Sequence, residues 1–234
     1  MIFDTSNTFV TSDHHFGHRN IIYYCGRDKS LADTVGKLID HDPDAALQMM
    51  DSVMIKTWND TVPEDATVIY LGDFALCKKQ RKEEILGQLN GKKSMMILGN
   101  HDSGPRSCKS IGFENVFRSA TLVVAGWPLK RLCVVHDPNA VLIESIASKL
   151  LGAGQKAHKG GRNSPRNGVE PLDGVICGHV HGLWSEKKTN GVQFINIGVD
   201  LNGFKPYKLV DVLDKFGLGR PEQVDIRGTI HIEQ

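Results

Sequence analysis

Five short segments carry carboxylate, imidazole or amide side chains that could bind metal ions, and each follows an apolar run. The segments are Asp13-His14-His15, Gly72-Asp73, Gly99-Asn100-His101-Asp102, His136 and Gly178-His179-Val180-His181. Such donors, without a thiolate, suit manganese, iron or zinc better than soft copper. They also exceed what one four-coordinate ion requires. The candidate metal ligands are Asp13, His15, Asp73, Asn100, His136, His179 and His181.

The spacing within two of these segments favours a shared site. In an extended segment, residues two positions apart point to the same side of the backbone. Asp13 and His15 should therefore present two ligands together, and so should His179 and His181. The intervening His14 should point away from the site, and we interpret it as a packed or hydrogen-bonded histidine.

Three glycines, Gly72, Gly99 and Gly178, directly precede candidate ligands where predicted strands end. Glycine accepts backbone angles that other residues avoid, so it permits a sharp turn at these positions.

Asp73 is the single candidate ligand of its segment and is the natural bridge between two ions. Two ions about 3.5–4 Å apart can hold a nucleophile and clamp the oxygens of an in-line displacement at phosphorus. The residues therefore predict hydrolysis of phosphate esters.

Short apolar runs rich in β-branched residues predict the strands that position these side chains. The predicted strands are Thr8–Thr11, Thr67–Leu71, Ser94–Leu98, Thr121–Ala125, Arg131–Val135, Gly174–Cys177 and Val192–Ile197, with a last one at Thr229–Ile232. Helices are predicted from Asp42-Pro43, where Asp can cap and Pro suits the first turn, and over Lys78–Leu89 and Ala140–Leu151. Strands alternating with helices indicate an α/β fold, in which ligands bind outside the carboxyl ends of the strands.

Length and composition favour one domain, residues 1–234, in the cytoplasm. A chain of 234 residues can bury a sizeable core as a single domain. The 28 Lys and Arg nearly balance the 27 Asp and Glu, so there is no strong nucleic-acid-binding signature. No apolar run suffices to span a membrane, and the start lacks a signal-peptide pattern. The five cysteines lack a C-x-x-C pair, which argues against a disulfide framework and a cysteine-based zinc site.

Basic side chains near the candidate ligands could bind a substrate phosphate. His18 and Arg19 closely follow the first ligand pair, and arginine offers paired donors to phosphate oxygens. The alternative for both is an exposed helix start. The basic loop between Lys156 and Arg166 could clamp a phosphate-rich substrate, although a solvated loop is the favoured interpretation.

In order and content, these segments resemble the conserved blocks of the calcineurin-like metallophosphoesterase superfamily: D-x-H, G-D, G-N-H-D/E, a lone H and G-H-x-H. The blocks run from Asp13 to His181 and so cover most of the chain. The opening from Ser12 to His18 and the later segment from Asn196 to Asp200 resemble a small bacterial and phage subgroup. One departure is that Gly72-Asp73 is followed by Phe74-Ala75-Leu76, where many relatives carry a second acidic residue.

The resemblance implies a four-layer α/β/β/α sandwich of two mixed β-sheets flanked by helices. It implies two divalent metal ions, manganese first, with iron, zinc or nickel as alternatives. The first ion would be held by Asp13, His15 and His181, the second by Asn100, His136 and His179, and Asp73 would bridge them. His101 would lie beside the leaving-group oxygen with Asp102 orienting its imidazole, and the nucleophile would be a metal-bound hydroxide.

The expected substrate is a phosphate-ester small molecule or nucleotide, with a diester favoured over a monoester. Alternatives are a phosphomonoesterase for nucleotides or phosphoproteins and a non-catalytic, metal-free binding module on the same fold. A processive nuclease would need extra domains and a stronger positive balance. An HD-type phosphohydrolase is excluded, because its His-Asp pairs lie on helices and those at His101 and His136 follow predicted strands. The physiological substrate, the native metal and the oligomeric state stay open.

Overall fold

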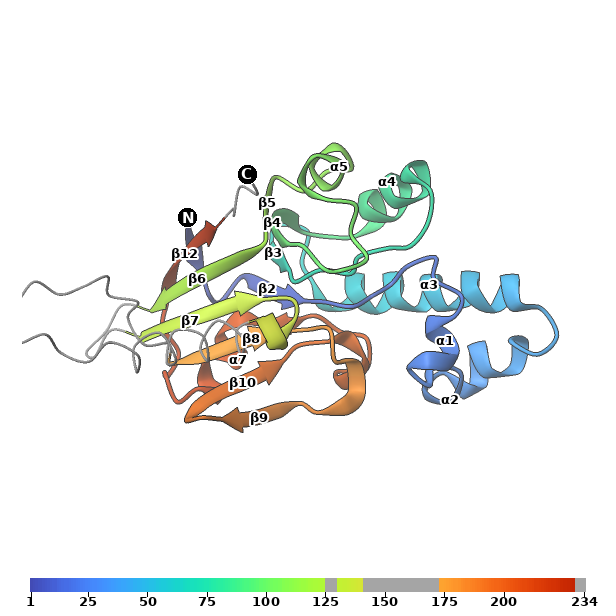
Figure 1. Cartoon of the computed structure of the whole chain (residues 1–234). Coiled ribbons are helices and arrows are strands. Elements are labelled where there is room, and N and C mark those ends of the chain that lie inside the picture. The colour runs from blue at the N-terminus through green and yellow to red at the C-terminus, as the bar shows by residue number, and fades with distance from the viewer. Residues whose placement is uncertain (125–129, 141–172, 230–234) are drawn as a thin grey trace, which may run out of the picture.

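Two mixed β-sheets form the centre of the fold in this computed structural model, which describes residues 1–124, 130–140 and 173–229 (Figure 1). Within these ranges the first sheet has the strand order β11-β2-β3-β4-β5. Strands β2 to β5 are mutually parallel, and β11 pairs antiparallel to β2. The bounds are β11 Tyr207–Lys208, β2 Thr8–Thr11, β3 Thr67–Tyr70, β4 Lys92–Ile97 and β5 Asn115–Phe117.

The second sheet has the order β1-β12-β6-β7-β8-β10-β9 in the described part of the chain. Strands β7, β8 and β10 run parallel to one another, and the other neighbours pair antiparallel. The bounds are β1 Ile2–Asp4, β12 Gln223–Thr229, β6 Ser119–Val124, β7 Lys130–Val135, β8 Gly174–Cys177, β10 Val192–Asn196 and β9 Glu186–Thr189.

The strands of the first sheet alternate between two hydrophobic cores. Ile69 and Met95 belong to the core that this sheet shares with the second sheet. Val68, Tyr70 and Met96 belong to the core on the opposite face, which the helices cover. Successive side chains of a strand point to opposite faces of the sheet, and here both faces are covered by a core. These strands are therefore continuous apolar runs in the sequence.

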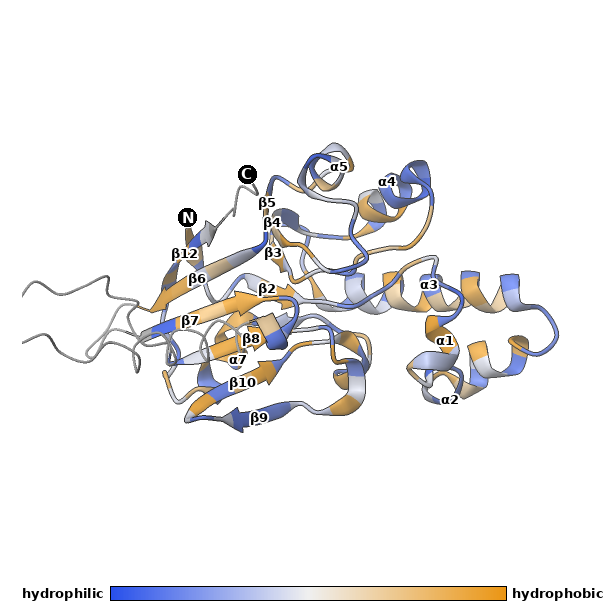
Figure 2. Cartoon of the chain, viewed as in Figure 1, coloured by the Kyte–Doolittle hydropathy of each residue, from blue (hydrophilic) through white to orange (hydrophobic). Residues whose placement is uncertain are grey.

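Helix α3 (Pro43–Thr61) is the longest element on the helical face of the first sheet. Asp42 caps it by accepting from the backbone N–H of Ala45 at 3.0 Å, and a proline occupies its first turn. Its buried Met50, Met54 and Trp58 lie on one side, so polar and apolar stretches alternate along it (Figure 2). The same face carries α4 (Lys79–Gln88) and α5 (Pro105–Ser110).

Shorter helices complete the described chain. Helix α1 (Ile21–Tyr24), α2 (Arg27–Ser30) and the π-turn η1 (Ala32–Gly36) precede α3. Helix α7 (Leu209–Lys215) buries Leu209, Val212 and Leu213 in the core between the sheets. Two 3-10 turns, η2 (His181–Leu183) and η3 (Val199–Leu201), lie in the C-terminal half. Within the described ranges, no helix has both the length and the apolar composition needed to cross a bilayer.

The predicted mixed α/β architecture is confirmed, with two mixed sheets and flanking helices. The seven strands predicted up to Ile197 and the helices at Asp42-Pro43 and Lys78–Leu89 are present, with bounds shifted by a few residues. Of the last predicted strand, Thr229–Ile232, only Thr229 lies in the described residues, where it ends β12 (Gln223–Thr229). Most of the predicted helix Ala140–Leu151 and the whole basic loop from Lys156 to Arg166 lie outside the described residues.

Candidate metal centre

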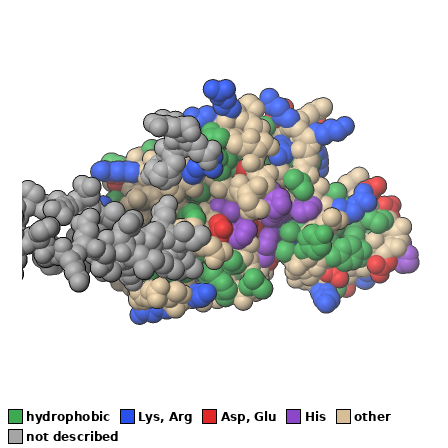
Figure 3. Space-filling model, viewed as in Figure 1, with side chains coloured by type: hydrophobic (Ala, Val, Ile, Leu, Met, Phe, Trp, Pro, Cys, Tyr) green, Lys and Arg blue, Asp and Glu red, His purple; other side chains and the backbone are tan. Residues whose placement is uncertain are grey.

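The carboxyl ends of β2, β3, β4, β7 and β8 bring the predicted ligands together on one face of the molecule, where the histidines gather (Figure 3). Six of these side chains form two groups, and within each group one ligand atom per residue lies within 4.8 Å of the others. The groups are Asp13, His15 and His181, and Asp73, His136 and His179.

Asp73 belongs to the second group and also contacts the first. Its Oδ2 atom is 3.4 Å from Nε2 of His15 and 3.3 Å from Nε2 of His136. The seventh predicted ligand, Asn100, places Oδ1 3.1 Å from Nε2 of His136 and 3.0 Å from Nδ1 of His179. One carboxylate therefore touches both groups, and the amide completes the second.

His15 provides the test of whether these residues fit a metal ion. Its side chain is 2% exposed, and neither ring nitrogen has a hydrogen-bond partner. An unpaired polar group that is buried costs free energy, so such a group in a native protein calls for a ligand. Imidazole and carboxylate donors are those that borderline divalent cations prefer. The residues thus fit divalent metal ions.

Burial and neighbouring carboxylates shift the pKa values of the histidines in the site. Burial lowers the pKa of His15 to about 3, so its ring is neutral and has a lone pair to donate. Burial also opposes charge on His136, but the hydrogen bond and charge of Asp73 outweigh it and raise the pKa to about 9. In the same way, Asp200 raises the pKa of His181 to about 10 against the effect of burial. A cation that enters must displace these protons.

Two ligand histidines are oriented by partners outside the groups. Nδ1 of His136 donates to the backbone oxygen of Leu71 at 2.7 Å. Nδ1 of His181 lies 2.8 Å from Oδ2 of Asp200. Such contacts fix the tautomer and leave Nε2 to face a metal.

A buried arginine, which sequence reasoning missed, supports this arrangement. Arg27 is 0% exposed and donates to the backbone oxygens of Asp13 at 2.7 Å and His14 at 2.6 Å. Its Nε donates to Oδ1 of Asp200 at 2.8 Å. Asp200 therefore joins Arg27 to the candidate ligand His181. The segment that ends at Asp200 was noted for its resemblance alone, and nothing in the local sequence distinguishes Arg27.

The ligand segments are not extended, which corrects the expected geometry. Positive φ angles occur at Asp13 (63°), His15 (53°), Asp73 (57°), His179 (69°) and His181 (46°). Non-glycine residues rarely adopt this left-handed region, and such strain clusters at functional sites. Residues two positions apart do reach the same site, but through tight turns instead of strand alternation.

The prediction that backbone angles require glycine is wrong for two of the three positions. Gly72 does take a positive φ of 85°, as the turn argument requires. Gly99 and Gly178 do not, and they are needed for space. A Cβ atom on Gly99 would overlap the carboxylate of Asp73, and one on Gly178 would overlap the hydroxyl of Ser12. Close approach of strand ends, not backbone angle, excludes side chains there.

Asp102 does not orient the imidazole of His101 as predicted. Its carboxylate accepts the backbone N–H groups of Gly99 and Asp73, both at 2.8 Å, and of Phe74 at 3.3 Å. The backbone N–H of His101 in turn donates to Oδ1 of Asp73 at 2.9 Å. Asp102 thus holds the two loops that carry Asp73 and His101 together.

His101 and His18 stand at the mouth of the site. The exposed ring of His101 has its centroid 5.2 Å from that of His15 and 6.0 Å from that of His18. His18 itself lies 5.5 Å from His15. Arg19 instead pairs with Asp44 at the start of α3. Of the two predicted substrate-binding residues, the described contacts bring His18 into the site.

His14 is packed away from the metal groups, as predicted. It is fully buried, with Nδ1 2.6 Å from the hydroxyl of Tyr70 and its ring stacked on Phe16 at 5.1 Å between centroids. The aromatic cluster beneath β2 therefore uses this histidine as a core residue.

All five cysteines are free, so no disulfide links them. The argument against cysteine near a metal was incomplete, however. Cys25 lies with His181 and Asp200 in a third group whose potential ligand atoms are within 4.8 Å of one another. Because this group shares His181 with the first, its thiol lies at the edge of the same centre.

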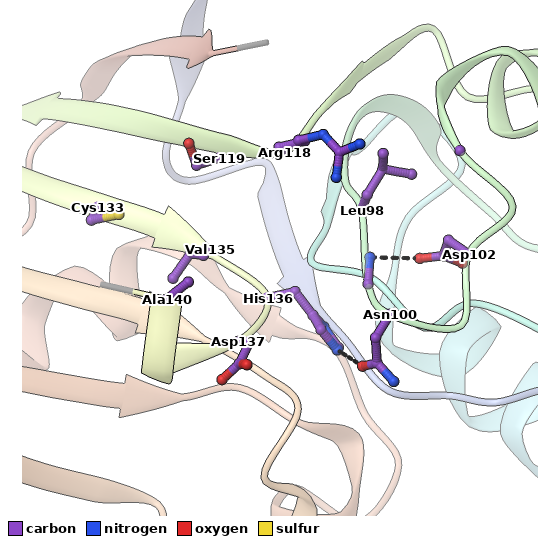
Figure 4. A pocket seen from close by; sticks show the side chains of 12 residues that line it. Leu98, Asn100, Asp102, Arg118, Ser119, Cys133, Val135, His136, Asp137 and Ala140 are labelled. Carbon is purple, nitrogen blue, oxygen red and sulfur yellow. Dashed lines mark hydrogen bonds between the residues drawn. The ribbon is translucent and has the colours of Figure 1, made fainter. Parts of the chain in front are cut away.

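A cavity of about 510 Å³ opens beside the second group (Figure 4). Asn100 and His136 form one part of its wall, so the cavity is continuous with the metal centre. The remaining wall includes Leu98, Val135 and Arg118. Its size lies in the range typical of small-molecule sites.

Comparison with known proteins gives relatives without an assigned activity. No protein-family model matches the chain. An uncharacterized protein of Methanocaldococcus jannaschii is 33% identical over 129 residues, which cover 51% of this chain and 64% of that protein. The gene 66 protein of Mycobacterium phage L5 is 32% identical over 102 residues, 43% of this chain and 41% of its own length. The match thus spans less than two thirds of either relative.

A solved structure resembles the whole fold. The crystal structure of a protein of unknown function from Aquifex aeolicus aligns with a TM-score of 0.55 at 19% identity. The alignment covers 89% of this chain and 97% of the Aquifex chain. At this identity the likeness concerns the fold alone.

Proposed function

We propose that this protein is a metal-dependent phosphoesterase of the calcineurin-like type, with two metal ions, that hydrolyses phosphodiesters in preference to monoesters. The observation that carries the proposal is that one carboxylate, that of Asp73, contacts both His136 of its own group and His15 of the other group. A bridging carboxylate is the element that a two-metal site requires and that a single structural ion does not.

The residues divide between two divalent ions, manganese first, with iron, zinc or nickel as alternatives. Asp13, His15 and His181 would hold one ion, Asn100, His136 and His179 the other, and Asp73 both. When bound, such ions polarise phosphoryl oxygens and lower the pKa of coordinated water.

The protein's own side chains supply the remaining chemistry. His101, which is exposed and has its ring centroid 5.2 Å from that of His15, would donate a ring proton to the departing ester oxygen. His18, whose ring lies next to that of His101, would contact a non-bridging phosphate oxygen. Asp102 acts by pinning the backbone at Gly99 and Asp73, which keeps His101 in register with the bridge.

A metal-free binding module is the weaker proposal, because the seven predicted ligands converge and the buried His15 among them has no hydrogen-bond partner for either ring nitrogen. Free cysteines accord with a reaction in the cytoplasm, where thiols stay reduced.

The test is hydrolysis of a chromogenic diester, bis(p-nitrophenyl) phosphate, and its monoester, p-nitrophenyl phosphate, by metal-stripped protein with and without manganese. Wild type is compared with His101→Ala, Asn100→Ala and the exposed control His41→Ala. We expect manganese to restore turnover, and both site variants to lose at least about a hundredfold in rate. Manganese binding without hydrolysis of either ester would refute the activity, and failure to bind manganese would favour the binding module.

A further inference from the structure

Helix α1 presents two tyrosines to solvent beside the candidate metal centre. Its first two residues, Ile21 and Ile22, are buried and fix the helix to the core. Its last two, Tyr23 and Tyr24, are 53% and 75% exposed. Holding a large aromatic ring in solvent forgoes the favourable burial of its apolar surface. The anchored helix therefore keeps apolar surface available that a ligand could cover.

Tyr24 lies next to the candidate metal centre through two neighbours. Its ring centroid is 6.5 Å from that of His18, and the two rings are nearly perpendicular. His18 in turn has its centroid 5.5 Å from that of His15 and 6.0 Å from that of His101. The residue after Tyr24 is Cys25, which belongs to the third group of potential ligand atoms. One ring, that of His18, thus separates Tyr24 from a candidate ligand and from the proposed proton donor.

Other apolar side chains are exposed close to the same centre. The exposed Leu183 lies in turn η2, which begins at the candidate ligand His181. The exposed Leu76 donates its backbone N–H to the backbone oxygen of Phe16, the residue that follows His15. Figure 3 shows hydrophobic side chains directly beside the histidines, over α1 and α2. Apolar surface that adjoins a polar centre is typical of sites that bind an organic ligand.

We propose that Tyr24 is a stacking platform for a nucleobase, and that the substrate is a phosphodiester with a nucleoside in one ester arm. The inference rests on the proposed function and names its substrate class. Every nucleobase has a flat π-face that can stack on an aromatic ring, whereas a simple alkyl arm has none. In a nucleotide ester one sugar separates the base from the phosphate, just as one ring separates Tyr24 from His15.

Two diesters that differ in the base alone test the proposal. They are thymidine 5′-(p-nitrophenyl phosphate) and its analogue with hydrogen in place of thymine, each hydrolysed by manganese-loaded protein. In wild type, we expect the base to raise kcat/KM about tenfold, as one stacking contact would. Tyr24→Leu should erase this gain. Tyr24→Phe should keep it, because phenylalanine retains the aromatic face.

Tyr23→Leu is the matched control. Tyr23 is the neighbouring exposed tyrosine of the same helix, and adjacent helical residues point in different directions. This variant should keep the full gain from the base. Because both tyrosines lie mostly in solvent, all three variants should retain the wild-type Tm, which thermal denaturation checks.

Calorimetric binding of thymidine 5′-phosphate to the same proteins provides a readout that does not depend on turnover. Its Kd should rise about tenfold in Tyr24→Leu and stay unchanged in Tyr24→Phe and Tyr23→Leu. If the base gives no gain, or Tyr24→Leu keeps the gain or slows both esters equally, the inference is overturned and the proposed function stands. If nothing is hydrolysed but thymidine 5′-phosphate binds through Tyr24, the proposed function fails and the base platform remains. If neither hydrolysis nor Tyr24-dependent binding is found, both fail.

Discussion

Replacement of Arg27 by methionine tests the buried support beneath the metal centre. Arg27 is 0% exposed and its ion-pair partner Asp200 is 7% exposed, so both charges lie outside bulk water. The Arg27→Met side chain would lie against Met50 and Met54, whose sulfur atoms already contact the guanidinium at 3.8 and 3.7 Å. The substitution therefore removes charge and donors while it keeps most of the packing.

The expected cost follows from the partners left behind. Removal of one partner of a buried ion pair typically costs about 3–5 kcal/mol. Here it leaves Asp200 with His181 as its remaining charged partner and deprives the backbone oxygens of Asp13 and His14 of donors. For a chain of this size, such a loss should lower Tm by about 6–20 °C.

The assay is denaturant unfolding of metal-stripped wild type and variant, with the midpoint and slope compared. Arg19→Met is the matched control, because Arg19 pairs with Asp44 on the surface, where the two side chains are 50% and 74% exposed. Such exposed pairs contribute about 0–1 kcal/mol. If Arg27→Met costs no more than Arg19→Met, the reasoning about buried support is refuted.

Three further predictions concern the protonation and packing of the centre. Manganese affinity should rise with pH between about 6 and 8, because His136 and His181 must release protons to bind the metal and their pKa values are raised to about 9 and about 10. Proton release on manganese binding, measured in weak buffer, should be positive. A pH-independent affinity would contradict this. Gly99→Ala should weaken the binding of both ions, because the new Cβ overlaps the carboxylate proposed to bridge them; calorimetry that shows two ions bound with wild-type affinity would refute the steric argument. Tyr70→Phe should lower the free energy of unfolding by about 1–3 kcal/mol, because it removes the hydrogen-bond partner of the buried His14. An unchanged denaturation midpoint would disprove this.

The strands that carry the candidate ligands could be predicted because their apolar runs are largely buried and a polar residue follows each of them. The run before Asp73 reads as continuously apolar for this reason. Edge strand β9 (Glu186–Thr189) could not be predicted in the same way, because its residues are mostly exposed and its lysines are not typical strand formers. Strand β12 does alternate, with buried Val224 and Ile226, and this signal was overlooked.

Some features of the candidate site could likewise be predicted from the sequence, and others could not. The convergence of the candidate ligands could be predicted because potential metal donors at strand ends form a local pattern. The role of Arg27 could not, because it depends on partners as distant in sequence as Asp200. Asp102 was misassigned because adjacency to His101 suggested a side-chain contact, whereas its carboxylate satisfies backbone groups of three other residues. Tertiary partners of charged residues are set by the fold and not by neighbours in sequence.

The number of metal ions bound per chain tests the central claim most directly. Metal-stripped protein would be loaded with manganese, freed of excess ion and analysed for manganese per chain, alongside His15→Ala and His136→Ala. The proposed centre predicts two ions in wild type and a lost or weakened ion in each variant, because each histidine belongs to a different group. One ion or none in wild type would contradict the two-metal centre.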